Sequence, residues 1–428
     1  MRNKQIWLLL AVVLLLCTAC SNAALEAAAT PAPTAGPQQT QEAAEQPGEG
    51  DVVVELPIAQ KENGIITAEQ WAEVHPEIYA SYMANNENKD VIDHVEEYPM
   101  IAKLYEGMAF NKFYNSARGH VYTLEDVFAT GRPHPLANCL TCKTPDFTKL
   151  VNDLSVEVYK YEFDEVYSDD GSIEPVSCYN CHANQAYTGE IVVTHSYLAS
   201  AMASEEGNVA PATLSCAQCH VEYYFDPETK ATTLPYSSLE TLSPDAILSY
   251  YNEMDFADYT NPRTGVRQIK VQHPEFETFM GEGSVHAATG FNCATCHMGQ
   301  KTAENGKTYT SHTWTSPLNN DDLIANSCAS CHQDLKAEVK AIQEASEARV
   351  YEIGYQLETL TDQLAAAVEG GEYAEEKLEQ IRSLNRDAQF YWDFVFVENS
   401  EGAHNSKLTN ACLDKAQALC EEALGLLK

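Results

Sequence analysis

Five short cysteine motifs restrict the possible folds of this 428-residue chain more than any other feature. Each motif has two cysteines separated by two residues, and in four of them a histidine follows directly. These four are Cys178–His182, Cys216–His220, Cys293–His297 and Cys328–His332. The first motif, Cys139–Lys143, reads Cys-Leu-Thr-Cys-Lys and ends in a lysine instead. Chance would give roughly 0.01 motifs followed by histidine in a chain of this composition, so the pattern indicates one repeated chemistry.

Covalent attachment of haem is the chemistry that needs this pattern. Two thiols three positions apart form thioethers to the haem vinyls, and the adjacent histidine supplies an axial imidazole to the iron. A zinc site would need its ligands in paired sets, and a redox dithiol would not need a histidine after each motif. We expect five haem c groups, attached at Cys139 and Cys142, Cys178 and Cys181, Cys216 and Cys219, Cys293 and Cys296, and Cys328 and Cys331.

The lysine motif sets one haem apart from the other four. Lys143 offers a primary amine where His182, His220, His297 and His332 offer imidazoles. Burial and the positive charge of the iron both favour the neutral amine that ligation requires. We interpret the haem of the first motif as the one that does chemistry, and the other four as electron carriers.

Residues 1–20 are expected to form a secretory leader of the lipoprotein type, with Cys20 as the lipidated first residue of the mature chain. Arg2 and Lys4 precede the apolar run Ile6–Leu16, which is short for a membrane span. Residues 21–50 lack aromatics and should form a disordered tether. An ordinary cleaved leader and a retained anchor are the alternatives. Each of the three places the chain outside the cytoplasm, in the periplasm or on the outer face of the cytoplasmic membrane.

The chain is strongly acidic, with 63 Asp and Glu against 26 Lys and Arg and a formal net charge of −37. This charge disfavours nucleic acid and anionic membrane surfaces as partners. A basic electron donor would suit it, although a solvated acidic surface explains the composition equally well.

The spacing of apolar residues predicts a mainly α fold with little β structure. Residues 60–332 read as loops and short helices around the haems, because haems fill volume that side chains would otherwise fill. After His332, apolar residues recur at steps of three and four, which predicts helices over about 335–370, 373–397 and 406–427. We expect residues 51–428 to form one pentahaem catalytic domain, in which the helices of 333–428 also supply a dimer interface.

One lysine motif followed by four histidine motifs resembles the ammonia-forming cytochrome c nitrite reductases, the pentahaem cytochrome c552 family. The resemblance extends over residues 65–410 and includes all five motifs. Further matching stretches are Arg118–Tyr122, Cys216–Phe225, Lys270–Pro274, Gly283–His297, Ser311–Pro317 and Gly402–Asn405.

The family pattern implies the second axial ligand of each electron-carrying haem. His120 would serve the haem on Cys216 and Cys219, and His286 the haem on Cys328 and Cys331. His312 would serve the haem on Cys178 and Cys181, and His404 the haem on Cys293 and Cys296. Four further histidines match no family ligand and are interpreted as ordinary surface or core residues; these are His75, His94, His134 and His195.

The resemblance also implies the reaction, which is the six-electron reduction of nitrite to ammonium at the Lys143 haem. The family's distal trio corresponds here to Arg132, Tyr223 and His273, with Arg118 as the alternative arginine. The arginine and histidine would hold the nitrite oxygens, and the histidine and tyrosine would help to deliver protons.

A calcium ion is implied as well. Glu222 would supply a carboxylate, Tyr223 and Lys270 backbone carbonyls, and Gln272 a side-chain oxygen, which together form a set of hard donors suited to Ca²⁺.

Two other functions stay open from the sequence. A pure electron-transfer cytochrome would have no substrate site, and a related reductase would act on hydroxylamine, nitric oxide or sulfite. By resemblance, the electron donor is a membrane quinol-oxidising multi-haem cytochrome or a soluble cytochrome, and the protein is a homodimer.

Overall fold

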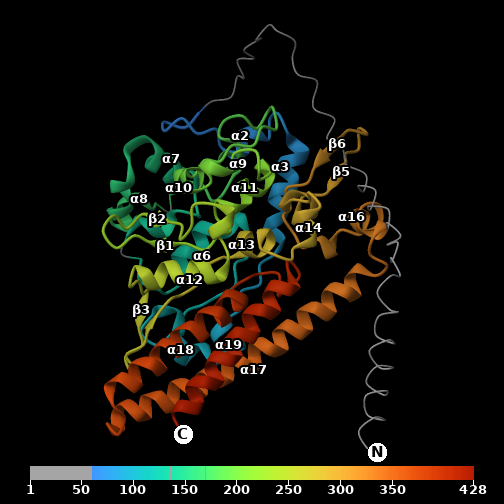
Figure 1. Cartoon of the computed structure of the whole chain (residues 1–428). Helices are drawn as coiled ribbons and strands as arrows, with labels where there is room; N and C mark the ends of the chain where they lie inside the picture. Colours follow the sequence, from blue (N-terminus) through green and yellow to red (C-terminus); the bar gives the residue numbers. More distant parts are fainter. Residues whose placement is uncertain (1–59, 135, 169) are drawn as a thin grey trace, which may run out of the picture. The chain divides into compact units, whose positions relative to one another are not determined.

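Three long helices form the C-terminal part of the chain. The computed structural model describes residues 60–134, 136–168 and 170–428, so the expected leader, Cys20 and tether lie outside the described residues. The helices are α17 (Leu335–Gly370), α18 (Glu375–Phe396) and α19 (Ser406–Leu426), which lie side by side at one side of the fold (Figure 1). All three helices predicted from apolar spacing are confirmed. Gly371 ends α17 with a left-handed φ of 65°, which glycine adopts without steric penalty.

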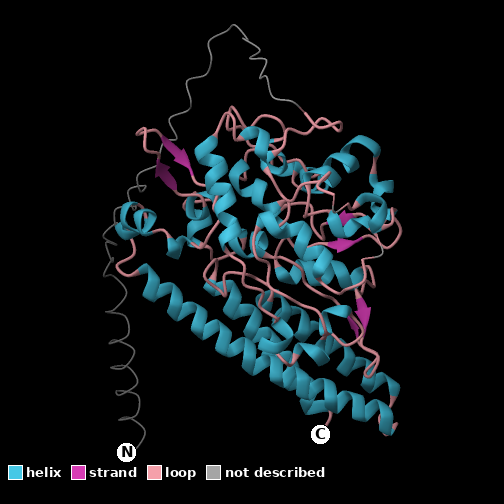
Figure 2. Cartoon of the chain, turned by 180° about the vertical axis from the view of Figure 1, so that it is seen from behind, coloured by secondary structure: helices cyan, strands magenta, loops and turns pink. Residues whose placement is uncertain are grey.

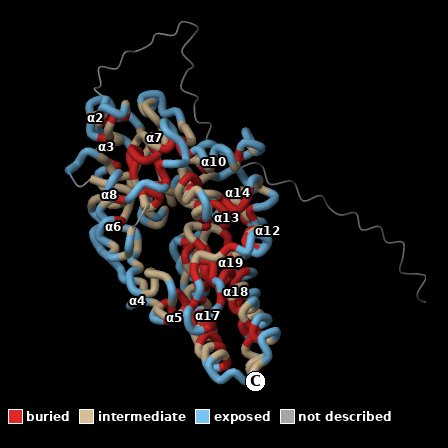
Figure 3. The backbone as a smooth tube through the Cα atoms, turned by 90° about the vertical axis from the view of Figure 1, so that its left-hand side faces the viewer, coloured by how far each residue is buried: buried red, intermediate tan, exposed pale blue. Residues whose placement is uncertain are grey.

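An apolar core holds these helices together. On α17 the residues that face α18 and α19 are buried, and they recur at helical spacing: Val350, Ile353, Leu357, Leu360 and Leu364. The same inward faces are buried along all three helices (Figure 3). Gly354 lies where a Cβ atom would approach Trp392 and Met100 to 3.1 Å, so a larger residue would push α17 away from its neighbours.

Short helices and long loops make up most of residues 60–332 (Figure 2). The α-helices are α2 (Ala68–Trp71), α3 (Pro76–Met83), α4 (His94–Glu97), α5 (Ile101–Leu104), α6 (Thr123–Ala129), α7 (Pro145–Leu154), α8 (Phe163–Val166), α9 (Cys178–His182), α10 (Ser196–Ala201), α11 (Pro211–Ala217), α12 (Pro244–Glu253), α13 (Glu275–Met280), α14 (Val285–Ala288), α15 (Cys293–His297) and α16 (Asp321–Asn326). The predicted mainly α fold is therefore confirmed.

Three antiparallel hairpins contain the strands of the described residues. They pair β1 (Tyr224–Phe225) with β2 (Thr232–Thr233), β3 (Tyr259–Thr260) with β4 (Arg267–Gln268), and β5 (Gln300–Thr302) with β6 (Thr308–Thr310). Among the described helices, none is both long enough and apolar enough to cross a membrane.

Candidate haem centres and active site

Short helical turns present the cysteine motifs. The second and fourth motifs coincide with α9 and α15, and each turn is closed at its start by a capping box, Ser177 with Asn180 and Asn292 with Thr295. In a helical turn, residues three and four apart lie on one face. Both thiols and the following histidine of a motif are therefore presented to the same side, as attachment to a single haem requires.

Each motif histidine faces one of the distal histidines implied by the family pattern. The ring centroids are 6.3 Å apart for His220 and His120, 6.3 Å for His182 and His312, 6.0 Å for His332 and His286, and 6.1 Å for His297 and His404. An imidazole nitrogen binds a metal at about 2 Å, so two rings on opposite sides of one ion have centroids roughly 6 Å apart. The four pairs therefore fit one haem iron each.

Hydrogen bonds at the other ring nitrogen orient several of these imidazoles. The Nδ1 atoms of His182, His297 and His312 lie 2.6 Å, 3.1 Å and 3.0 Å from the backbone carbonyls of Glu190, Thr315 and Thr310. A carbonyl oxygen can only accept, so each Nδ1 carries the hydrogen and each Nε2 keeps a lone pair for iron.

Carboxylates accept the Nδ1 hydrogen bond of two further histidines. His332 Nδ1 lies 2.7 Å from Glu338, and His404 Nδ1 lies 2.7 Å from the buried Glu398. Carboxylate partners raise the basicity of an imidazole ligand, so they strengthen the bond it makes to a metal.

The lysine motif lies beside the other residues of the predicted active site. Burial is the main cause that lowers the pKa of His273 to about 4, with Glu275 opposing the shift and the nearby Lys143 adding to it. Burial raises the pKa of Tyr223 well above its usual value, with Cys142 and Cys139 adding to the shift and Arg132 opposing it. The structure therefore brings these side chains together around the first motif.

Arg132 is a mostly buried cation without a carboxylate partner among the ion pairs of the described residues. Its guanidinium lies 4.2 Å from the centre of the Phe110 ring, and burial lowers its pKa. A buried charge that lacks a counterion is costly, so such a group is suited to receive an anion.

The alternative arginine, Arg118, is already paired with carboxylates. Arg118 Nε lies 2.8 Å from Asp126, one of its terminal nitrogens lies 2.8 Å from Glu125, and the guanidinium stacks on Tyr122 at 3.9 Å. Two carboxylates neutralise this side chain, which leaves Arg132 as the arginine free to bind a substrate anion.

The residues implied for calcium converge around a buried carboxyl group. Glu222 is fully buried and accepts hydrogen bonds from the Tyr251 hydroxyl at 2.8 Å and the Gln272 backbone N–H at 2.6 Å. The Gln272 side-chain amide donates to the Lys270 carbonyl at 2.8 Å. Burial raises the pKa of Glu222 well above its usual value, and neighbouring Glu277 adds to the shift. A cation at this place would stabilise the ionised carboxylate.

Comparison with known proteins identifies the family. The family profile described as Cytochrome c552 matches residues 67–428. The chain belongs to the cytochrome c552 family. As a c-type cytochrome it carries covalently bound haem c.

Two relatives of this cytochrome are similar over most of its length. Cytochrome c-552 of Desulfotalea psychrophila is 30% identical over 387 residues, which cover 82% of this chain and 73% of the relative. The solved structure of cytochrome c nitrite reductase from Desulfovibrio desulfuricans, described with two calcium sites in its catalytic subunit, has a TM-score of 0.76. It is 26% identical, and the match covers 87% of each chain.

Two buried residues that sequence reasoning did not single out touch the predicted site. Asp393 on α18 lies 3.3 Å from the Lys270 ammonium and accepts from the Val271 N–H at 2.9 Å. An aspartate within the apolar stripe Phe390–Val395 is a signal that could have drawn attention to it. His195, interpreted as an ordinary histidine, is 3% exposed and contacts two haem motifs.

Proposed function

We propose that this cytochrome reduces nitrite to ammonium in a six-electron reaction at the haem on Cys139 and Cys142. The observation that carries the proposal is the half-buried Arg132 guanidinium, which has no carboxylate counterion in the described part of the chain and interacts electrostatically with Tyr223. Its charge and planar donor array suit a small oxyanion. The similarity to the Desulfovibrio nitrite reductase supports the same reaction.

The proposal assigns five haems to the chain's own ligands. Lys143 would hold the iron of the active haem, and four pairs of histidines would hold the others: His182 with His312, His220 with His120, His297 with His404, and His332 with His286. When bound, the haem irons supply the one-electron carriers and the site at which nitrite is reduced.

Three side chains act on the substrate. Arg132 binds the anion and stabilises negative charge on its oxygens. His273 has a buried Nδ1 without a protein partner in the described residues, so this nitrogen is available to the substrate or to a water molecule. Because burial favours the neutral form of His273 and of Tyr223, the two groups can hold and pass protons without adding fixed charge.

Contacts between the motifs indicate the order of the electron carriers. Cys142 Sγ lies 4.0 Å from the carbonyl of Gln218, so the third haem is expected beside the active one. Helix α11, which carries Cys216, contacts both α9 and α15, the helices of the second and fourth motifs. Electrons would therefore reach the active haem through the third haem, which branches towards the second and the fourth.

Calcium is part of the proposal. Glu222, Gln272 and the carbonyls of Tyr223 and Lys270 would hold one Ca²⁺ close to His273, and the ion would neutralise the buried carboxylate. The calcium sites of the Desulfovibrio enzyme support this assignment.

The cellular setting completes the proposal. The protein would work in the periplasm or on the outer face of the cytoplasmic membrane, with a lipid anchor at Cys20 and electrons from a membrane quinol-oxidising or soluble cytochrome. It would form a homodimer through its long C-terminal helices, of which α17 exposes 47% of Tyr355.

The test uses the purified holoprotein with reduced viologen dye as the electron source. We expect a mass equal to the mature chain plus five haems, and nitrite-dependent dye oxidation that yields ammonium. A protein with five haems that makes no ammonium from nitrite would overturn the proposal. A mass that fits four haems would overturn the role of Lys143.

A further inference from the structure

A buried polar cluster joins the first three haem-attachment motifs. It consists of Thr194, His195 and Gln218, which we call the hub, and their side chains are 8%, 3% and 1% exposed. Gln218 lies between Cys216 and Cys219 of the third motif, whereas Thr194 and His195 directly precede α10.

The Gln218 amide links the third motif to the second. Its Oε1 accepts from the backbone N–H groups of Thr194 at 2.8 Å and His195 at 3.1 Å. Its Nε2 donates to the carbonyls of Asn180 at 2.7 Å and Ser215 at 3.0 Å. Asn180 lies inside the second motif. Four backbone partners therefore fix which end of the amide is oxygen and which is nitrogen.

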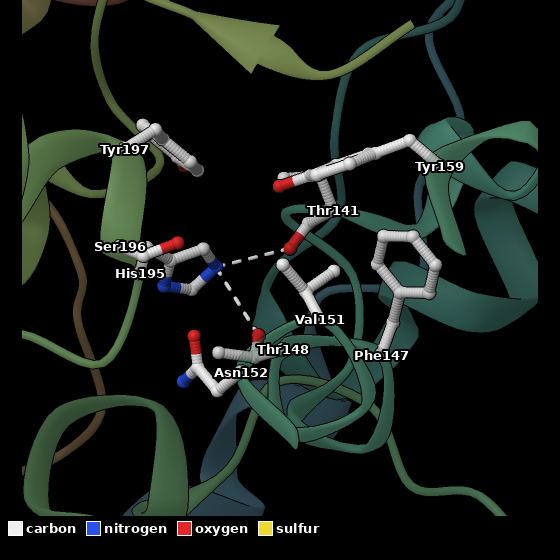
Figure 4. A pocket seen from close by; sticks show the side chains of 9 residues that line it. All are labelled: Thr141, Phe147, Thr148, Val151, Asn152, Tyr159, His195, Ser196 and Tyr197. Atoms are coloured by element: carbon white, nitrogen blue, oxygen red, sulfur yellow. Dashed lines mark hydrogen bonds between the residues drawn. The ribbon is translucent and has the colours of Figure 1, made fainter. Parts of the chain in front are cut away.

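His195 extends the link to the lysine motif. Its Nε2 lies 3.0 Å from the carbonyl of Thr141, which stands between Cys139 and Cys142, and the ring points at this carbonyl in Figure 4. Its Nδ1 lies 3.0 Å from Gln218 Oε1. Thr194 Oγ1 lies 3.4 Å from the same Nδ1, so both ring nitrogens have polar partners.

The surroundings hold the ring in this position. Thr148 lies 3.3 Å from Nε2, and the cavity beside the ring has a volume of only about 10 Å³. That is no more than the space of about one water molecule. The ring is therefore held between the lysine motif and Gln218 of the third motif.

We propose that His195 is a positioning residue that holds the attachment loop of the active haem against the loops of the next two haems, and that this contact tunes the reduction potential of the active haem. This inference rests on the haem assignments proposed above. Hydrogen bonds around a haem are among the means by which a protein sets its potential.

The test compares holoprotein variants by redox titration monitored through absorption and EPR. In His195→Gln, we expect five haems and a shifted potential for the lysine-ligated haem. A tenfold change in the equilibrium constant for one-electron transfer to this haem corresponds to ~59 mV. We also expect kcat to fall while the KM for nitrite stays unchanged, because the substrate groups are untouched.

Two further variants complete the test. His94→Gln is the matched control, since His94 pairs with Glu97 at 3.2 Å and touches no haem motif. Gln218→Met keeps the His195 ring and removes the amide that holds it, so it should shift the same potential even if His195→Gln yields no holoprotein. The inference is overturned if neither variant shifts the potential relative to His94→Gln. A wild type that makes no ammonium overturns the proposed function instead.

Discussion

Replacing Arg132 by glutamine tests the anion site directly. The guanidinium is mostly buried, stacks on Phe110 and lacks a carboxylate partner in the described chain, so its charge is available to nitrite. Removing one preorganised donor to a developing negative charge costs about 3–4 kcal/mol, which is a fall of roughly 10²–10³ in kcat/KM. Arg132→Lys keeps the charge but loses the planar array of donors, so its fall in kcat/KM should be intermediate.

Steady-state ammonium formation with a viologen donor measures this effect, after the haem content of each variant has been shown to equal that of the wild type. Two arginines provide comparisons. Arg118→Gln tests the alternative assignment, and Arg263→Gln removes a surface arginine that pairs with Asp362 at 2.8 Å. Both should retain the wild-type KM for nitrite. The reasoning is refuted if the kcat/KM of Arg132→Gln stays within threefold of the wild-type value. It is also refuted if Arg118→Gln loses more activity than Arg132→Gln.

Three further changes test the residues around the site and the packing of the long helices. Asp393→Asn leaves the buried Lys270 ammonium without its counterion, and loss of one partner of such a pair costs about 3–5 kcal/mol; an unchanged thermal midpoint would contradict this. Gly354→Leu forces a side chain against Trp392 and should destabilise the helices by about 1–3 kcal/mol, again seen as a lower midpoint. Chelation of calcium should lower activity until Ca²⁺ is restored, whereas Glu222→Gln should respond neither to chelator nor to added Ca²⁺.

Local patterns in the sequence were sufficient to predict the long helices and to identify the haem motifs. The apolar spacing of α17 predicted its whole extent, because residues that pack on one face of a helix recur every three or four positions. The distal histidines needed the family resemblance, since nothing local marks His312 as the partner of His182, 130 positions away (312 − 182). The role of His195 was missed because it depends on contacts between loops that are distant in sequence.

The choice between Arg132 and Arg118 shows a second limit of sequence reasoning. Both arginines precede the lysine motif, and only tertiary structure reveals that acidic partners neutralise one of them. Asp393 likewise lies on the buried face of α18, where its neighbours are apolar.

The long helices have a consequence for how the protein matures. Their core consists of side chains alone, including Leu357, Leu360, Trp392 and Leu413, all with no exposed surface. The loops of residues 60–332 carry all five motifs and hold a smaller apolar cluster that includes Phe147, Val158 and Phe163. We expect the helices to form before any haem is attached, and the contact between Asp393 and Lys270 then to hold the loops against them. A haem missing from one motif would leave the loops unfinished while the helices persist, so a partly loaded chain would retain much of its helical content.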